Sequence, residues 1–125
     1  MATRSTIAAR KDADGRIISI YCHWDGYPAG VGATLQEHYT TWDKVDSLMA
    51  LGDLSVLGAE IGIQKNFDND TLDGECLAYG RDRGEQGVEA KVHETYIDYI
   101  NYRTEQGCEY AYLWNGVNWE TASLD

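Results

Sequence analysis

A junction rich in aromatic and glycine residues contains the first side chains that could bind a ligand. It spans residues 23–32, with the sequence HWDGYPAGVG, where a strand is expected to give way to a helix. Glycines ahead of a helix N-terminus expose backbone N–H groups, which favour a bound anion. The Walker spacing and its lysine are absent, and Gly30-Val31-Gly32 is too short for the dinucleotide fingerprint. Two interpretations stay open: Trp24, Asp25 and Tyr27 bind a ligand, or the segment is a tight turn in which Trp24 and Tyr27 cap the core.

A pair of arginines forms the second candidate site. Arg81 and Arg83 flank Asp82 in the segment GRDRGE at residues 80–85. Guanidinium groups match phosphate and carboxylate geometry, so the pair is the best local anion-binding signal in the acidic part of the chain. The alternative is a solvated loop in which the arginines pair with neighbouring acids.

The third candidate is an aromatic face near the C-terminus. Residues 109–114 and 117–121 flank Asn115-Gly116, the strongest two-residue hairpin signal in the chain. Pairing across such a turn sets Trp114 opposite Val117 and Tyr112 opposite Trp119, and one face then carries most of the large rings. Such a face can stack a flat ligand, with Trp119 as the expected contact. The alternative is that the rings pack into the core.

Residues suited to catalysis or metal binding are few. Cys22, His23, Asp25 and His38 have no recognised metal-ligand spacing, so neither a metal nor another cofactor is expected. A nucleophile–base pair such as Cys22 with His38 stays open, but no catalytic motif supports it, and no catalytic residue is assigned. The three cysteines have no CxxC pairing and are expected to be buried, reduced thiols. They are Cys22, Cys76 and Cys108.

Charge is distributed unevenly along the chain, which has a net charge of −11. Residues 1–24 carry four basic and two acidic side chains, whereas the remaining 101 carry 6 basic and 19 acidic ones. An acidic body repels nucleic acid and anionic membranes, but it can attract a basic protein surface, including one that holds nucleic acid. The carboxylates expected to contact such a protein are Asp68, Asp70, Asp73, Glu75 and Glu85. The alternative is that the acidic surface merely favours solubility.

Several elements must position these candidates. Strands are expected at 3–11 and 16–24, joined by a turn at 12–15, and further strands at 60–65 and 75–81. One helix is expected after Gly30, and a second from Thr40 or Thr41 to Gly52. A third helix of about fifteen residues is expected to end at Gly107.

The fold class predicted from these elements is α+β, in a single domain over residues 1–125. An antiparallel sheet would combine the N-terminal and C-terminal hairpins with the middle strands, and about three helices would pack mainly on one face. The alternative is two separate hairpins bridged by helices. A chain of 125 residues can bury about two-thirds of its unfolded surface. No apolar run approaches the ~20 residues of a membrane span, and the first residues lack a signal-peptide core, so a cytoplasmic protein is expected.

The segment SIYCHWDGYP at residues 19–28 resembles a family of small, mostly uncharacterised proteins encoded by bacteriophages and prophages. The similarity covers at least residues 3–58, and the segment AYGRDRGE at 78–85 also fits it. The shared pieces are Arg4-Ser5-Thr6-Ile7, the Gly30-Val31-Gly32 segment with Leu35 and His38-Tyr39, Lys44-Val45, and Leu51-Gly52-Asp53-Leu54-Ser55. The family carries no catalytic assignment, so the resemblance transfers no functional residue.

The resemblance implies a counter-defence protein that works in the cytoplasm of a host bacterial cell by stoichiometric binding. The first hypothesis is an acidic inhibitor of a bacterial immune protein or complex, including by mimicry of nucleic acid. The alternative is an oligomeric sponge that sequesters a nucleotide-derived immune signal, gripped by Arg81 or Arg83 and an aromatic ring of Trp24, Tyr27 or Trp119. A small enzyme is the third hypothesis. Direct binding to nucleic acid or to a membrane is not expected.

Overall fold

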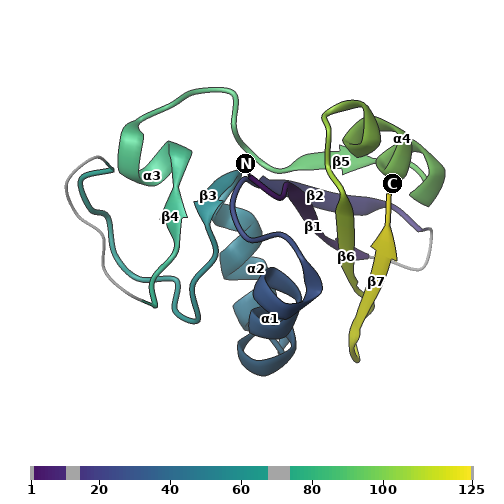
Figure 1. Cartoon of the computed structure of the whole chain (residues 1–125), viewed down its shortest axis with the longest axis horizontal. Helices are drawn as coiled ribbons and strands as arrows, with labels where there is room; N and C mark the ends of the chain where they lie inside the picture. The colour runs from purple at the N-terminus through teal and green to yellow at the C-terminus, as the bar shows by residue number, and fades with distance from the viewer. Residues whose placement is uncertain (1, 11–14, 68–73, 125) are drawn as a thin grey trace.

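The computed structural model describes residues 2–10, 15–67 and 74–124 of the chain. Within them the chain forms seven strands and five helical segments (Figure 1). The strands are β1 (Ser5–Arg10), β2 (Ile17–Cys22), β3 (Leu54–Val56), β4 (Leu77–Ala78), β5 (Lys91–His93), β6 (Tyr110–Trp114) and β7 (Trp119–Ser123). The helical segments are the π-helical η1 (Pro28–Gly32), α1 (Ala33–His38), α2 (Trp42–Leu51), α3 (Tyr79–Arg83) and α4 (Tyr96–Glu105). No helix among the described residues has the length and apolar character needed to cross a membrane.

The α+β class is confirmed, but the single sheet is mixed rather than antiparallel as expected, because β1 pairs with β6 and β2 with β3 in parallel. The strand order is β4-β3-β2-β1-β6-β7, and β5 pairs with β2 beside that path. Both hairpins are antiparallel, as expected. They are joined through a parallel pairing of β1 with β6, from Ser5 opposite Tyr110 to Ala9 opposite Trp114. The alternative of two separate hairpins is therefore wrong.

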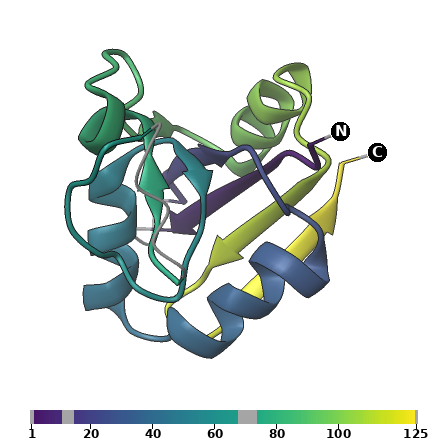
Figure 2. The same ribbon diagram turned by 60° about the vertical axis from the view of Figure 1, so that its left-hand side comes forward.

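Helices cover both faces of the sheet (Figure 2). Helices α1 and α2 pack on one face, where the larger core includes Ile20, Leu35, Leu48 and Trp114. Helix α4 covers the other face through a smaller cluster centred on Tyr99. The expectation that the helices lie mainly on one face missed α4, because both faces of β2 are buried and its sequence alternation points only to one.

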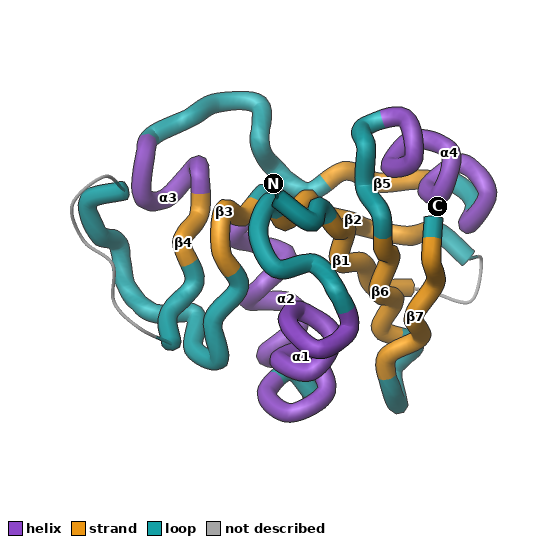
Figure 3. Tube along the Cα trace, in the orientation of Figure 1, coloured by secondary structure: helices purple, strands orange, loops and turns teal. Residues whose placement is uncertain are grey.

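The middle of the chain differs most from the prediction. Residues 60–65 form no strand and are drawn as loop in Figure 3, with one isolated bridge between Glu60 and Glu75. Residues 75–81 divide between β4 and the start of α3. The predicted fifteen-residue helix is ten residues long, because β5 first pairs with β2 and Thr95 then caps α4 by accepting a hydrogen bond from the Asp98 N–H.

The C-terminal hairpin has a four-residue loop rather than a two-residue turn. Trp114 lies opposite Trp119 and Tyr112 opposite Thr121. The Asn115 side-chain oxygen accepts hydrogen bonds from the backbone N–H groups of Val117 and Asn118, at 2.8 and 2.9 Å, which closes the longer loop. The register moves by two residues, so the aromatic rings keep their common face. Tyr112, Trp114 and Trp119 are buried there as part of the core.

Candidate functional site

A hollow of about 340 Å³ lies where the start of β1, the end of β2 and the end of α4 meet. We call it the N-terminal hollow. It is lined by Ala2, Arg4, His23, Trp24, Gly107 and Glu109. The hollow therefore combines a guanidinium, an imidazole, an indole and a carboxylate, supplied by three segments that are distant in the sequence.

Arg4 is the cation of the N-terminal hollow. Its backbone is fixed because its carbonyl accepts a 2.8 Å hydrogen bond from the Glu109 N–H, next to the parallel pairing of β1 with β6. Its guanidinium lies against Gly107, where a Cβ atom would approach Arg4 Nη1 to 3.1 Å and where the backbone φ of +85° favours glycine. Among the described residues, no side chain forms an ion pair with Arg4.

His23 is held in place by the phenol of Tyr21. The Tyr21 hydroxyl and His23 Nδ1 are 2.8 Å apart. Burial raises the pKa of Tyr21 to about 12, although the nearby Arg4 opposes this, so the phenol stays protonated at neutral pH. This contact engages Nδ1 and leaves Nε2 as the ring nitrogen that Tyr21 does not contact. The imidazole therefore adds a polar ring to the hollow that Arg4 lines.

The predicted residues Trp24, Asp25 and Tyr27 remain together in the loop between β2 and η1. Trp24 is 44% exposed and Tyr27 42% exposed, so neither ring caps the core. The Tyr27 hydroxyl donates a 3.2 Å hydrogen bond to the Asp25 carboxylate. Asp25 has a left-handed φ of 58°, and Trp24 meets His23 edge to face with ring centroids 4.8 Å apart. Trp24 is the member of this group that lines the hollow.

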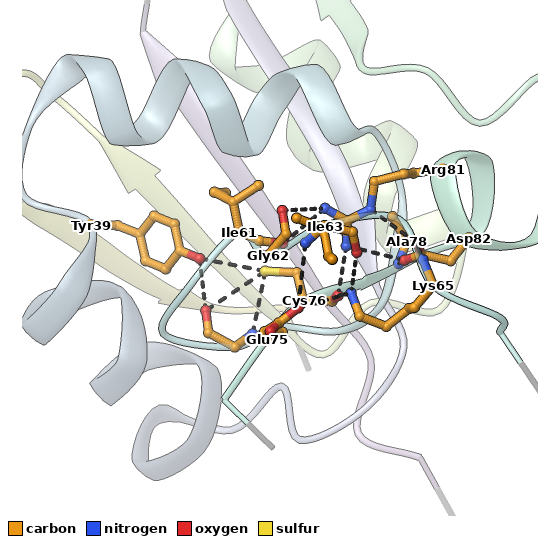
Figure 4. Close-up of polar contacts among 11 residues, drawn as sticks. Tyr39, Ile61, Gly62, Ile63, Lys65, Glu75, Cys76, Ala78, Arg81 and Asp82 are labelled. Carbon is orange, nitrogen blue, oxygen red and sulfur yellow. Dashed lines mark hydrogen bonds and ion pairs between the residues drawn. The ribbon is translucent and has the colours of Figure 1, made fainter. Parts of the chain in front are cut away.

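The Arg81 guanidinium is engaged in hydrogen bonds within the chain (Figure 4). Its Nη1 donates to the carbonyls of Ile61 and Gly62, at 2.9 and 3.2 Å, and its Nη2 donates to the carbonyl of Cys76 at 2.9 Å. Nε and Nη2 also bind the two carboxylate oxygens of Asp82. The guanidinium thus ties the loop after β3 to β4 and α3, and its donors are engaged within the chain.

The predicted acid Glu75 belongs to the same network. Lys65 Nζ donates to the carbonyls of Ile63 and Cys76, at 2.7 and 3.0 Å, and lies 3.3 Å from a Glu75 carboxylate oxygen (Figure 4). The Lys65 side chain is buried. Glu75 therefore balances a buried ammonium. The other predicted acids of this region, Asp68, Asp70 and Asp73, lie outside the described residues.

Arg83 and Glu85 bind one another. Arg83 Nη2 donates a 2.5 Å hydrogen bond to a Glu85 carboxylate oxygen. The Arg83 guanidinium also lies 4.8 Å from the ring centroids of both Phe67 and Tyr79. A predicted ligand-binding cation and a predicted protein-binding acid thus satisfy each other on the surface of α3.

Trp119 lies at a second hollow of about 420 Å³, beside the tip of the β6–β7 hairpin. The residues that line it, Gln36, Thr40, Trp114, Val117, Asn118 and Trp119, include no charged side chain. Trp119 is 8% exposed, and its indole N–H donates a 2.8 Å hydrogen bond to the Tyr39 carbonyl. The ring is part of the core, and its surroundings do not favour an anion.

The thiols and histidines form no catalytic or metal group within the described residues. Burial raises the pKa of Cys22 to about 12, so this thiol stays protonated at neutral pH. His38 lies at the exposed end of α1, whereas Cys22 is fully buried. No group of three or more His, Cys, Asp or Glu side chains with the arrangement of a metal site occurs in the described ranges.

The structure brings one predicted residue, Trp24, into a hollow with Arg4 and His23, while α3 holds Arg81 and Arg83 elsewhere. Arg4 was missed as a site residue, although the basic character of residues 1–24 was the signal that could have found it. Glu109 and Gly107 carry no sequence signal for a site, because only the β1–β6 pairing brings them to Arg4. No family model, curated protein or solved structure matches the chain, so its candidate site rests on its own geometry.

Proposed function

We propose that the protein is a binding protein that captures a small, anionic, nucleotide-like ligand in the N-terminal hollow. The observation that carries this proposal is the Arg4 guanidinium, which has no ion-pair partner among the described residues and lies in the same hollow as the exposed Trp24 ring. The proposal gives no residue a catalytic role.

The donors and the ring suit the two ends of such a ligand. A guanidinium binds phosphate through paired N–H groups, and the His23 imidazole adds a second polar group beside it. An indole face stabilises a stacked base by about 1–3 kcal/mol. Glu109 adds an acceptor for ring or amino N–H groups, which a nucleobase has and a simple phosphate lacks.

Because the chain is acidic overall, binding of an anionic ligand requires basic side chains at the site itself. A chain with a net charge of −11 repels an anion at long range, and this repulsion weakens as salt is added. Arg4 belongs to the first 24 residues, which carry four basic and two acidic side chains. A ligand of this chemistry agrees with the sponge hypothesis for a nucleotide-derived immune signal, with Arg4 in the role first expected of Arg81 or Arg83.

Calorimetric titration with a panel of cyclic nucleotides and ADP-ribose-type nucleotides tests the proposal. We expect saturable binding of at least one member, weakened about tenfold or more by Arg4→Gln, since a charge-assisted hydrogen bond contributes about 1.5–3 kcal/mol. Trp24→Ala should weaken it further. Arg83→Gln is the matched control, because it removes the same charge from α3. If no nucleotide binds, or if R4Q binds as tightly as R83Q, the proposal is wrong.

An acidic inhibitor of a bacterial immune protein is a second candidate. It is favoured because basic side chains in the acidic part of the chain form ion pairs within the chain. Lys65, Arg81 and Arg83 are each paired with one acidic side chain, so these three cations do not neutralise the other acidic side chains of residues 25–125. A basic protein captured from bacterial lysate should dissociate as salt rises. Replacing Asp68, Asp70 and Asp73 by Asn should weaken that complex, whereas a salt-insensitive complex would contradict electrostatic inhibition.

A further inference from the structure

The described part of the sheet has three strands with an open edge, and they are not equally protected. Strand β4 has two residues and β5 has three, one of which is Lys91. Strand β7 has five residues, Trp119–Ser123, without proline or lysine. Short length, lysine and proline are the usual features that keep edge strands from pairing with other chains. Strand β7 is therefore the edge best suited to accept another strand.

Alternate residues of β7 point their backbone groups away from β6. The Asn115 N–H donates to the Asn118 carbonyl at 3.2 Å, and the Leu124 N–H donates to the Glu109 carbonyl at 2.9 Å. Hydrogen-bonded pairs recur at every second residue of an antiparallel ladder, so Glu120 and Ala122 also bond to β6. The N–H and C=O groups of the residues between them face outward. These residues are Trp119, Thr121 and Ser123.

We propose that this edge binds a second copy of the chain, with the two β7 strands antiparallel about a twofold axis at Thr121. Thr121 then lies opposite Thr121 of the second copy, and Trp119 opposite Ser123 of the second copy. All three outward-facing residues exchange both of their hydrogen bonds in this register. A closed twofold pairing of identical surfaces is the commonest arrangement among homo-oligomers.

Charge selects this register among its neighbours. With the axis at Thr121, Glu120 lies opposite Ala122 of the second copy. With the axis at Glu120, the two Glu120 carboxylates lie directly opposite each other, which destabilises a strand pair. With the axis at Ala122, only Thr121 and Ser123 can pair within the described strand. The register centred on Thr121 thus satisfies the most backbone groups without opposing like charges.

The complex is expected to be weak and to depend on concentration and salt. Pairing of two edges buries less surface than the roughly 1,200–2,000 Å² of a standard stable interface. Each copy also carries a net charge of −11, so the copies repel one another at low salt. Added salt should therefore strengthen the dimer, in contrast to an electrostatic complex with a basic partner.

Sedimentation velocity on the full chain, with Thr121→Pro and Thr121→Ala variants, tests this inference. Proline removes an N–H that faces away from β6, so the T121P fold is retained while one pair of intermolecular hydrogen bonds is lost. We expect a monomer–dimer equilibrium for the natural chain and for T121A between about 10 µM and about 1 mM, and a monomer for T121P. Circular dichroism checks that T121P is folded.

Amide hydrogen exchange gives a second measurement at the residues concerned. The Thr121 and Ser123 amides should become protected as protein concentration rises, whereas the Glu120 and Ala122 amides should be protected at every concentration. A chain that stays monomeric to about 1 mM at high salt overturns the inference. A dimer that persists in folded T121P, or that protects other amides, also overturns it. These outcomes concern β7 and do not depend on whether Arg4 binds a nucleotide.

Discussion

Asp82 shows how one carboxylate can organise a segment without regular structure. It is buried and accepts hydrogen bonds from the backbone N–H groups of Lys65 and Ala78, at 3.0 and 2.8 Å, and from the Arg81 guanidinium. Burial alone would raise its pKa, but these hydrogen bonds together hold the pKa of Asp82 below its ordinary value. The loop before β4 therefore depends on an ionised side chain from α3.

Replacing Asp82 by Asn should lower the free energy of unfolding by about 3 kcal/mol, because it leaves the Arg81 guanidinium without its buried partner. Denaturant unfolding followed by circular dichroism measures the change. Arg83→Gln is the control, since the exposed pair of Arg83 with Glu85 should contribute less than about 1 kcal/mol. Equal losses in D82N and R83Q would show that the Asp82 network does not stabilise the fold.

His93 lies among groups that disfavour its charged form. Ser19 Oγ lies 2.8 Å from His93 Nε2 and also accepts two hydrogen bonds from Arg103, at 3.1 and 2.9 Å. The serine proton must therefore point to Nε2, which keeps the imidazole neutral. Burial first, and then the positive charge of Arg103, lower the pKa of His93, while Asp98 opposes them. The rings of Tyr99 and Tyr102 complete its surroundings.

Stability should therefore fall as the pH decreases below about 6.5, where the unfolded chain protonates this histidine before the folded one does. The loss from His93 cannot exceed about 1.4 kcal/mol per pH unit. Unfolding free energies measured from pH 7.5 to 5.5 should decline less steeply in His93→Gln than in the natural chain. His38→Gln, at the exposed end of α1 and outside this network, is the matched control variant. A slope unchanged in H93Q would contradict this assignment.

The α-helices α2 and α4 begin at side chains that the sequence partly reveals. Thr41 Oγ1 accepts a 3.3 Å hydrogen bond from the Lys44 N–H, and Thr95 Oγ1 accepts one of 3.1 Å from the Asp98 N–H. The pattern of a threonine followed three residues later by a polar residue predicted the start of α2 at Thr40 or Thr41. It could not choose between them, because the choice depends on which hydroxyl faces the first turn.

Thr41→Ala should lower the free energy of unfolding by about 1 kcal/mol, the usual effect of losing an N-cap. Thr40→Ala is the matched control one residue away. It removes the same atoms from a residue that caps no described helix, so it should change stability by less than about 0.5 kcal/mol. Thermal and denaturant unfolding of both variants measures the difference. A larger loss of stability in T40A than in T41A would mean that Thr40, and not Thr41, is the N-cap of α2.

Local signals predicted the hairpins and α2 because those elements depend on neighbouring residues. They failed at the hairpin loop, where the Asn115 side chain closes a four-residue loop around the Asn115-Gly116 signal. They also failed at β3 and β5, which have three residues each: β5 pairs with β2, and β3 lies between β2 and β4. Elements that short carry no periodicity of their own.

The net charge of −11 acts on the molecule as a whole. Like charges spread over a compact chain repel one another, and unfolding relieves that repulsion. The partly buried pair of Lys65 with Glu75 is screened much less by salt than exposed groups are. Added salt should therefore weaken the repulsion more than it weakens this pair.

Raising sodium chloride from about 20 mM to about 200 mM should raise Tm by about 3–5 °C, as long-range repulsion becomes screened. Differential scanning calorimetry at low protein concentration measures this without a contribution from dimers. Sucrose at equal osmolality is the control, because it adds no ions. A Tm that falls with salt would mean that attraction between charged groups outweighs their repulsion.

The candidate site is also a property of the whole molecule, because distant segments of the chain form it. Only part of it could therefore be predicted from the sequence. Trp24 stood out because an aromatic residue beside glycines is conspicuous in the sequence. Its neighbours Arg4, Gly107 and Glu109 come from both ends of the chain, and the β1–β6 pairing brings them together. Arg81 was predicted from local sequence alone, and tertiary contacts with Ile61 and Gly62 occupied its guanidinium.

The same parallel pairing of β1 with β6 has a consequence for the order of events during synthesis. The N-terminal hairpin can form early. Strand β1 cannot pair with β6 until β6 has been synthesised, which happens after every other described element except β7. Pairings between residues so distant in sequence slow folding. Until β6 arrives, the apolar edge of Ile7, Ala8 and Ala9 stays open to solvent and to other nascent chains. A stalled or truncated chain that lacks β6 and β7 should therefore aggregate rather than persist as a partly folded protein.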